Sequence, residues 1–259
     1  MARNGEASKP MVTPLGCGVA ESWARLSAGH SGIHEITRFS TEGLRTQIAG
    51  SVDFMDVEPI TIPSHSYAMA DEAIREAMTQ SGIVEDGAFP GDLFLAAPPI
   101  EHDWLSREYL AGHLSAGENS PYGRRPLERA TKDMFPYHED FLNGTIGDRF
   151  AARYGITGSP ITLTTACASG ASTIQLAVEA IRRGDAPAAL AVGTDGSIQE
   201  ESVIRFALLS ALSTKNDPPQ SASRPFSKNR DGFVMAEGAA ALVLEDPEHA
   251  RARGAEILG

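Results

Sequence analysis

The sequence predicts an α/β fold with a mostly parallel sheet flanked by helices. Short apolar stretches rich in β-branched residues or alanine alternate with amphipathic helical patterns along much of the 259 residues. Two such stretches, 161–165 and 188–192, enclose a helical pattern, which is typical of two parallel strands joined by a right-handed crossover. The apolar content of 42% is that of a globular protein once glycine is added.

The first part of the chain predicts two helices and one strand. Residues 19–28 have a helical pattern, and residues 67–78 place Ala, Met and Ile on one side and acidic residues on the other. Residues 93–97 form an apolar run typical of a buried strand. Residues 101–134 mix charges, glycine, proline and aromatics, which predicts an irregular excursion of short helices and loops.

The rest of the chain continues the alternation. Gly184 and Pro247 set two helix boundaries, because glycine ends helices and proline is tolerated in their first turn. The expected elements, in order, are a helix at 138–154, a strand at 161–165, a helix ending at 183, a strand at 188–192, a helix through 204–209, a loop at 213–231, a strand at 239–244 and a short helix at 247–253.

One turn carries the strongest chemical signal in the chain. Residues 160–170 have the pattern of a strand, a turn of small residues that holds Cys167, and the start of a helix. A helix N-terminus favours a nearby anion by roughly 0.3–2 kcal/mol, and the thiolate is the nucleophilic form of cysteine. That contribution does not complete the activation of a thiol, so a partner base or cation, usually a histidine, is still needed.

A second interpretation makes Cys167 a structural residue, because free cysteines are often buried as small apolar side chains. Ala166, Ala168, Ser169 and Gly170 surround it, and a turn with so little bulk leaves room for a ligand to approach. The spacing by itself leaves both interpretations open.

Several stretches occur in an order characteristic of one family. They are residues 11–16, 23–32, 164–170 (TTACASG), 211–214 with 223–226, 231–233, and 237–245 (EGAAALVLE). Together they resemble the β-ketoacyl-acyl-carrier-protein synthases of the thiolase superfamily, most closely the type that elongates long acyl chains. Any one stretch would be weak evidence, but the set in register is specific. The residues around Cys167 fit elongating synthases better than polyketide ketosynthase modules.

The resemblance implies a thiolase-like layered fold and the acyltransferase activity of a 3-oxoacyl-[acyl-carrier-protein] synthase in fatty acid elongation. Cys167 would take an acyl group from acyl carrier protein as a thioester. A malonyl-carrier thioester then loses carbon dioxide, and its carbanion attacks the acyl group in a decarboxylative Claisen condensation. The family's oxyanion hole includes the backbone N–H at the position of Cys167, which fits an amide at a helix start.

The resemblance also suggests roles for three other residues. Phe233 matches a position beside the acyl pocket, where a ring lines or gates access; an ordinary core aromatic is the alternative. Arg124 and Arg125 are candidates for docking the carrier, because carriers are acidic and this chain has a net charge of −12. The alternative for this pair is a solvated loop with scattered charge.

The resemblance covers only the first of the family's two similar halves. Residues 1–259 are therefore expected to be the N-terminal domain, with the C-terminal half absent. The family's two catalytic histidines and its lysine lie in that second half. The seven histidines of this chain stand outside any motif, so solvated surface is expected for them. Alone, the chain is expected to be inactive, and a homodimer is implied for the full-length form.

Two stretches depart from the family pattern. Residues 1–10 are polar where the family has an apolar strand that is central in the sheet. Pro98 and Pro99 stand where the family usually has a glycine-rich loop, and they stiffen the turn. The chain-length preference of the acyl pocket is therefore open.

Composition and residue spacing exclude several classes of protein and of site. The acidic balance argues against nucleic acid, which needs a basic face. No run of eighteen apolar residues predicts a membrane span, and no hydrophobic signal region opens the chain. Cys17 and Cys167 form no disulfide framework, so the cytoplasm is the simplest location. The spacing of histidines and cysteines suggests no metal site, and the resemblance implies no cofactor.

Three hypotheses remain for function. The first is a condensing enzyme, or its N-terminal half, that uses Cys167. The second is a catalytically incomplete fragment or non-catalytic partner subunit that binds acyl carrier protein; Cys167 argues against it, because non-catalytic relatives replace the nucleophile. The third is another cysteine acyltransferase of the same superfamily.

Overall fold

The computed structural model describes residues 11–84, 87–99 and 142–259. Residues 1–10, the excursion expected at 101–134 and the docking candidates Arg124 and Arg125 lie outside these ranges.

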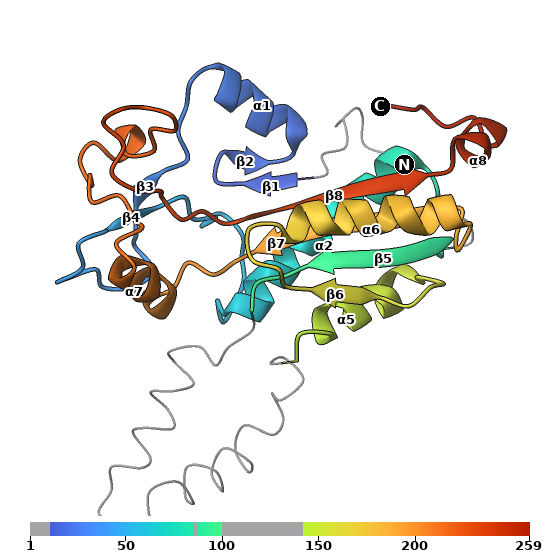
Figure 1. Cartoon of the computed structure of the whole chain (residues 1–259), viewed down its shortest axis with the longest axis horizontal. Helices are drawn as coiled ribbons and strands as arrows, with labels where there is room; N and C mark the ends of the chain where they lie inside the picture. Colours follow the sequence, from blue (N-terminus) through green and yellow to red (C-terminus); the bar gives the residue numbers. More distant parts are fainter. Residues whose placement is uncertain (1–10, 85–86, 100–141) are drawn as a thin grey trace, which may run out of the picture.

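A six-stranded sheet forms the centre of the described structure (Figure 1). From one edge to the other its strands are β2 (Gly16–Cys17), β1 (Met11–Thr13), β8 (Gly238–Glu245), β7 (Ala188–Asp195), β5 (Gly91–Ala96) and β6 (Ile161–Leu163). A separate ladder pairs β3 (His34–Glu35) with β4 (Ile48–Ala49).

The sheet is mixed, with a smaller parallel part than the sequence predicted. Strands β6, β5 and β7 run parallel, as expected for strands joined by crossover helices. Strand β8 runs antiparallel to β7 along its full length, and the β1–β2 hairpin is antiparallel too. An apolar run has no direction in its composition, so the sequence predicted β8 as a strand and could not predict its orientation.

Helices cover both faces of the sheet, which gives the predicted layered α/β arrangement. Helix α6 (Ser169–Arg183) lies in front of the sheet in Figure 1, and α2 (Ile62–Ser81) lies behind it. Helix α5 (Thr145–Tyr154) packs on the same side as α2. The remaining helices are α1 (Val19–Ser27), α7 (Glu200–Leu208), α8 (Pro247–Ala252) and the short 3₁₀ turn η2 (Pro219–Ser221).

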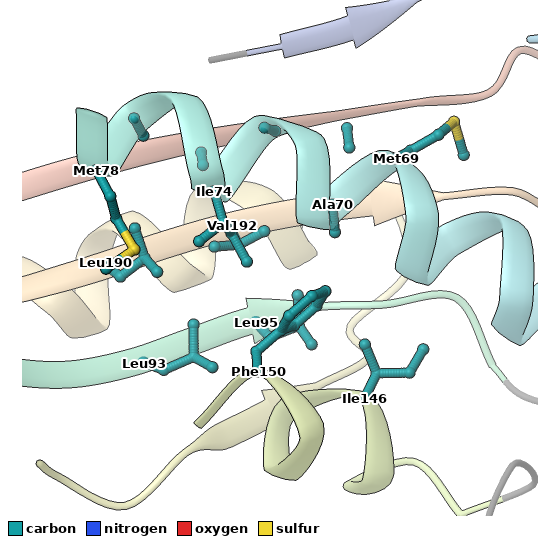
Figure 2. Close-up of a cluster of buried hydrophobic side chains, with 14 of the residues drawn as sticks. Met69, Ala70, Ile74, Met78, Leu93, Leu95, Ile146, Phe150, Leu190 and Val192 are labelled. Atoms are coloured by element: carbon teal, nitrogen blue, oxygen red, sulfur yellow. The ribbon is translucent and has the colours of Figure 1, made fainter. Parts of the chain in front are cut away.

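Side chains along each strand point alternately to the two faces of the sheet, which gives one apolar core on each face. Leu190 and Val192 of β7 face α2, while Ala189 and Ala191 face α6. Figure 2 shows the α2 side, where the helix lies over the large side chains of β5 and β7. On the α6 side the contacts are mainly alanines, including Ala177 at 0% exposure, so this helix lies close against the sheet.

The predicted helices that fall within the described ranges are present, with shifted ends. Helix α6 ends at Gly184, which has a left-handed φ of 77°. Helix α2 begins five residues before the predicted start at residue 67, because Thr61 and Ser64 form a capping box there. None of the described helices is long and apolar enough to cross a membrane.

Candidate active site

Cys167 lies in the tight turn that connects β6 to α6. Ala166, just before it, has a left-handed φ of 52°, which non-glycine residues rarely adopt. The hydroxyl of Ser169 holds this turn: Oγ accepts a hydrogen bond from the Thr165 N–H at 2.7 Å and donates one to the Ala166 carbonyl at 2.7 Å. The strand-turn-helix arrangement predicted from residues 160–170 is therefore present.

A second set of hydrogen bonds fixes the strand before the turn to its neighbour. Thr164 Oγ1 donates to the Ala97 carbonyl at 2.8 Å, and the Ala97 N–H donates to the Leu163 carbonyl at 3.3 Å. The ends of β5 and β6 are thereby held together beside Cys167. Pro98 and Pro99 follow directly and line the same space, so the proline pair that departs from the family pattern lies at the site.

The side chain of Cys167 is exposed and faces a cavity of about 920 Å³. This position excludes the interpretation of Cys167 as a buried structural residue. The cavity lies where the carboxyl ends of β5 and β7 meet the turn that holds Cys167, the usual place for ligands in α/β sheets. Gly170, at the start of α6, has no heavy atom within 4 Å of a Cβ built on it, so the space beside the turn is open.

One face of helix α7 forms a wall of this cavity. Its lining residues recur at helical spacing and change character along the helix. They are Glu201, Ser202 and Arg205 toward the helix start and Phe206 and Leu209 toward its end. Arg205 Nη2 is 2.5 Å from Glu201 Oε1, an i,i+4 ion pair. This wall was not predicted from the sequence, although the spacing of these residues was the available signal.

Phe233 packs on this wall and is not itself a cavity-lining residue. Its ring meets that of Phe206 edge to face, with centroids 5.4 Å apart and planes at 80°. Phe233 is 45% exposed, so the alternative of an ordinary core aromatic does not hold. The ring of Phe206 lines the cavity, with Phe233 behind it.

A buried carboxylate lies at another wall. Glu237 accepts two hydrogen bonds from Arg38, both at 2.7 Å, and further bonds from the N–H groups of Val52 at 2.9 Å and Ile198 at 3.2 Å. Its side chain has 0% exposure. Burial alone would lower the pKa of Arg38, but its bonds to Glu237 and Asp53 raise it above its ordinary value. Sequence reasoning did not find this network.

His65 lies next to this network and outside the cavity lining. Its Nδ1 is 3.8 Å from Glu237 Oε1, and the residue is 1% exposed. Burial lowers the pKa of His65 below its ordinary value, and Arg38 adds to this effect, so the neutral ring is favoured. In the three described ranges no histidine lines the cavity with Cys167. His65 is buried, which corrects the expectation of solvated surface for this residue.

Asp195, at the end of β7, is an acid in the cavity lining. Its Oδ1 accepts hydrogen bonds from the Ser197 N–H, at 3.0 Å, and from the Ser197 hydroxyl. Asp195 is exposed to solvent, but nearby protein atoms partly desolvate its carboxylate, and this desolvation raises its pKa despite the hydrogen bonds from Ser197, which lower it. Within the described part of the chain, no group of three or more His, Cys, Asp or Glu residues could hold a metal ion.

Comparison with known proteins shows which family this chain matches. Residues 10–250 match the family described as "Beta-ketoacyl synthase, N-terminal domain". The chain is 34% identical over 258 residues to 3-oxoacyl-[acyl-carrier-protein] synthase 2 of Rhizobium meliloti, a match that covers 95% of this chain and 60% of that protein. It is 32% identical over 250 residues to the tetracenomycin polyketide synthase ketoacyl synthase alpha subunit of Streptomyces glaucescens, covering 93% and 57%.

Solved structures agree with this assignment. A ketosynthase from a type II polyketide synthase, solved in complex with its acyl-carrier protein, has a TM-score of 0.76 and 28% identity, covering 97% of this chain and 60% of that one. A β-ketoacyl synthase from Burkholderia phymatum has a TM-score of 0.70 and 26% identity, covering 97% and 61%. The chain thus spans about three-fifths of the length of these relatives.

Proposed function

Because the chain belongs to the β-ketoacyl synthase family, we propose that it supplies the acyl-accepting half of a 3-oxoacyl-[acyl-carrier-protein] synthase. The observation that carries this proposal is the exposed Cys167 on a fixed turn at the start of α6, open to a cavity of about 920 Å³. A nucleophile in such a position can be reached by a thioester, and the cavity has room for an acyl chain.

In the proposed reaction the Cys167 thiolate attacks the carbonyl carbon of an acyl-carrier thioester. A tetrahedral oxyanion forms, and the backbone N–H of Cys167 is the candidate donor to it. The carrier thiolate leaves and takes up a proton. A malonyl-carrier thioester then loses carbon dioxide, and its carbanion attacks the acyl-cysteine carbonyl. Carbon–carbon bond formation releases the β-ketoacyl product and regenerates the Cys167 thiolate.

Partners of this reaction are inferred from the relatives. Acyl carrier protein is the proposed donor, supported by the relative solved with its carrier, and Arg124 and Arg125 remain the docking candidates. Phe206, backed by Phe233, is proposed to line the acyl path. A homodimer through β6 is proposed as well, because β6 is an edge strand of the sheet and Ile161 on it is 46% exposed.

The alternative is a non-catalytic partner subunit or an incomplete fragment. The lining of the cavity contains no described histidine that could serve the decarboxylation step, which supports incompleteness. Retention of an exposed Cys167 favours the acyl-accepting role over a purely structural one. We therefore propose that acyl transfer to Cys167 and full condensation are separable in this chain.

Acylation of Cys167 tests the proposal. Incubation with an octanoyl thioester of acyl carrier protein or N-acetylcysteamine should add one octanoyl group, located by peptide mass spectrometry. Cys167→Ala should abolish this labelling. The matched control is Cys17→Ala, because Cys17 is only partly exposed and lies in β2, outside the cavity lining. Labelling that persists in Cys167→Ala, or that disappears in Cys17→Ala, would contradict the proposal.

A condensation assay tests the incompleteness of the chain. The 259-residue chain, given acyl and malonyl thioesters of carrier protein, should form acyl-cysteine without releasing a β-ketoacyl product. Steady-state product release at the rate of an intact synthase would show that the chain carries the whole reaction.

A further inference from the structure

We propose that His34 is a pH-sensitive clasp for the wall of the cavity that contains Glu237. With a protonated ring, His34 holds the segment 51–53, and this segment holds Glu237 in place. The hold weakens as pH rises and the ring loses its proton. The clasp adds a pH response to the site and does not depend on acyl transfer to Cys167.

Both ring nitrogens of His34 lie close to oxygen atoms that accept hydrogen bonds. Nδ1 is 3.0 Å from the Glu35 carbonyl, and Nε2 is 3.3 Å from the Ser51 carbonyl and 3.6 Å from Asp53 Oδ2. A neutral imidazole has one N–H group and one lone pair, whereas the imidazolium has two N–H groups. Only the protonated ring can therefore donate at both ends.

The hydroxyl of Ser51 is the group that can change its partner. Its oxygen lies 3.4 Å from His34 Nε2 and 2.7 Å from Asp53 Oδ2, and Ser51 is only 4% exposed. With a proton on Nε2, the hydroxyl donates to Asp53 without competition. Without that proton, Nε2 becomes an acceptor that competes with Asp53 for the same hydrogen. The ring proton therefore decides how firmly Ser51 is bound to Asp53.

The charges beyond Asp53 favour a proton on His34. Asp53 Oδ1 is 2.6 Å from Arg38 Nε, and Arg38 also donates to both oxygens of Glu237 at 2.7 Å. Two carboxylates thus share one guanidinium, and a protonated His34 supplies a second positive charge. Burial alone would raise the pKa of Asp53, but its hydrogen bonds and the positive charges beside it lower that pKa below the ordinary value. The carboxylate is therefore ionised across the range in which histidines titrate.

The other histidine of this network lies at its buried end. His65 Nδ1 is 3.8 Å from Glu237 Oε1, His65 is 1% exposed, and burial lowers its pKa. The side chain of His34 is 42% exposed. The added charge therefore enters the network at His34, where water can solvate it.

Ser51 lies between the two backbone groups that hold Glu237. The Gly50 carbonyl accepts from the Glu237 N–H at 2.9 Å, and the Val52 N–H donates to Glu237 Oε2 at 2.9 Å. Gly50 also forms a β-bridge with Ala236, and both Ala236 and Glu237 line the cavity. A change at the Ser51 side chain is therefore only one residue away from each contact with the cavity wall.

Amide hydrogen exchange at Val52, followed by NMR on the full chain, tests the clasp because this N–H donates to Glu237. At about pH 6 the amide should exchange about threefold more slowly in the wild type than in His34→Gln, the size expected for a partly exposed ion pair. At about pH 8 the two rates should be equal. Comparing the two proteins at one pH cancels the intrinsic pH dependence of exchange. The same ratio at both pH values would overturn the proposal.

Two further variants locate the effect. His30→Gln removes another exposed histidine shortly before β3 and should leave Val52 exchange unchanged at both pH values. In a Ser51→Ala background, His34→Gln should no longer change Val52 exchange at the lower pH, because the hydroxyl that responds to the ring proton is gone. An undiminished effect in that background would overturn the role assigned to Ser51.

The wild type gives a test that does not depend on the folding of any variant. In a pH titration followed by NMR, the Val52 amide resonance should move together with the ring protons of His34. Movement that follows His65 instead, or no movement, would overturn the proposal. If Cys167 takes no acyl group, the proposed function fails, while these measurements still decide whether His34 is the clasp.

Discussion

Glu237 connects three segments of the chain through one buried carboxylate. It binds Arg38, which lies 199 positions away, and the backbone N–H groups at residues 52 and 198. Its own N–H donates to the Gly50 carbonyl at 2.9 Å. Since Glu237 also lines the cavity, this network joins a wall of the cavity to the segments around residues 38, 52 and 198.

Replacing Glu237 by alanine should strongly destabilise the protein. The change leaves the buried Arg38 with Asp53 as its remaining carboxylate and leaves the N–H groups of Val52 and Ile198 without their acceptor, which together cost about 3 kcal/mol. Urea unfolding monitored by circular dichroism measures this loss. Arg183→Gln, which breaks an exposed pair with Asp185, serves as the control and should leave the midpoint unchanged. A Glu237→Ala protein as stable as the wild type would contradict this account.

His65 should make stability depend on pH. Its folded pKa is lowered by burial, while the unfolded value is about 6.5. The unfolded chain therefore binds the proton more readily, and stability rises with pH in this range. The free energy of unfolding should fall as pH drops below about 6.5, until the lowered folded pKa is reached.

Comparison with His65→Gln isolates this contribution from that of its neighbours. Glu237, Arg38 and Asp53 face the ring and are present in both proteins. Unfolding measured from about pH 7 to pH 5 should give a shallower acid-side slope in the variant. Parallel slopes in the two proteins would show that His65 takes up its proton equally in both states.

Glu237 and His65 have surroundings that the sequence does not predict, in contrast to Cys167. Cys167 could be identified because its signal is local, a small-residue turn between a strand and a helix. The partners of Glu237 are joined only by the fold, and no local pattern relates residue 38 to residue 237. His65 likewise has a polar sequence neighbourhood but is buried by tertiary packing.

Helix α2 shows how an element is fixed at its ends. Thr61 Oγ1 accepts from the Ser64 N–H at 3.1 Å, and Ser64 Oγ accepts from the Thr61 N–H at 2.9 Å. At the other end Gly82 adopts a left-handed φ of 60°. The predicted helix at 67–78 was too short because apolar periodicity marks the buried part of a helix and not its capped first turn.

Loss of the cap should destabilise α2 measurably. Thr61→Ala removes the acceptor for the Ser64 N–H and should lower the free energy of unfolding by about 1 kcal/mol. Thr79→Ala makes the same change at an exposed interior position of the helix, where alanine has the better propensity, and should be neutral or slightly stabilising. Equal effects of the two substitutions would argue against the capping box.

The whole molecule is organised by its mixed sheet. Parallel strands β5, β6 and β7 bring the Cys167 turn and the end of β7 to one edge of the sheet, and antiparallel β8 places Glu237, just before its first residue, at the same edge. The sequence predicted β5, β6, β7 and β8 as strands and did not predict the short strands β1 to β4. The order and direction of the strands follow from long-range pairing, which local patterns do not encode. One outer strand, β6, is also the strand that leads into Cys167.

Pairing of two molecules through β6 should be sensitive to charge at this edge. Ile161→Lys places a cation on a 46% exposed edge position and should shift the proposed homodimer toward monomer in analytical ultracentrifugation. Ile257→Lys makes the same change at a 52% exposed position after α8 and should not alter the association state. If Ile161→Lys sediments like the wild type, β6 is not the contact.

The attachment of α7 has an evolutionary consequence. Val203 and Ala207 pack α7 on a buried cluster, while four of its residues and the following Leu209 line the cavity. Substitutions among the cavity-lining residues other than Phe206 would change the cavity wall and leave the packed interior almost untouched. Such a segment can accumulate changes without loss of foldability, so the shape and polarity of the cavity can be altered by a few mutations in one short stretch of the gene.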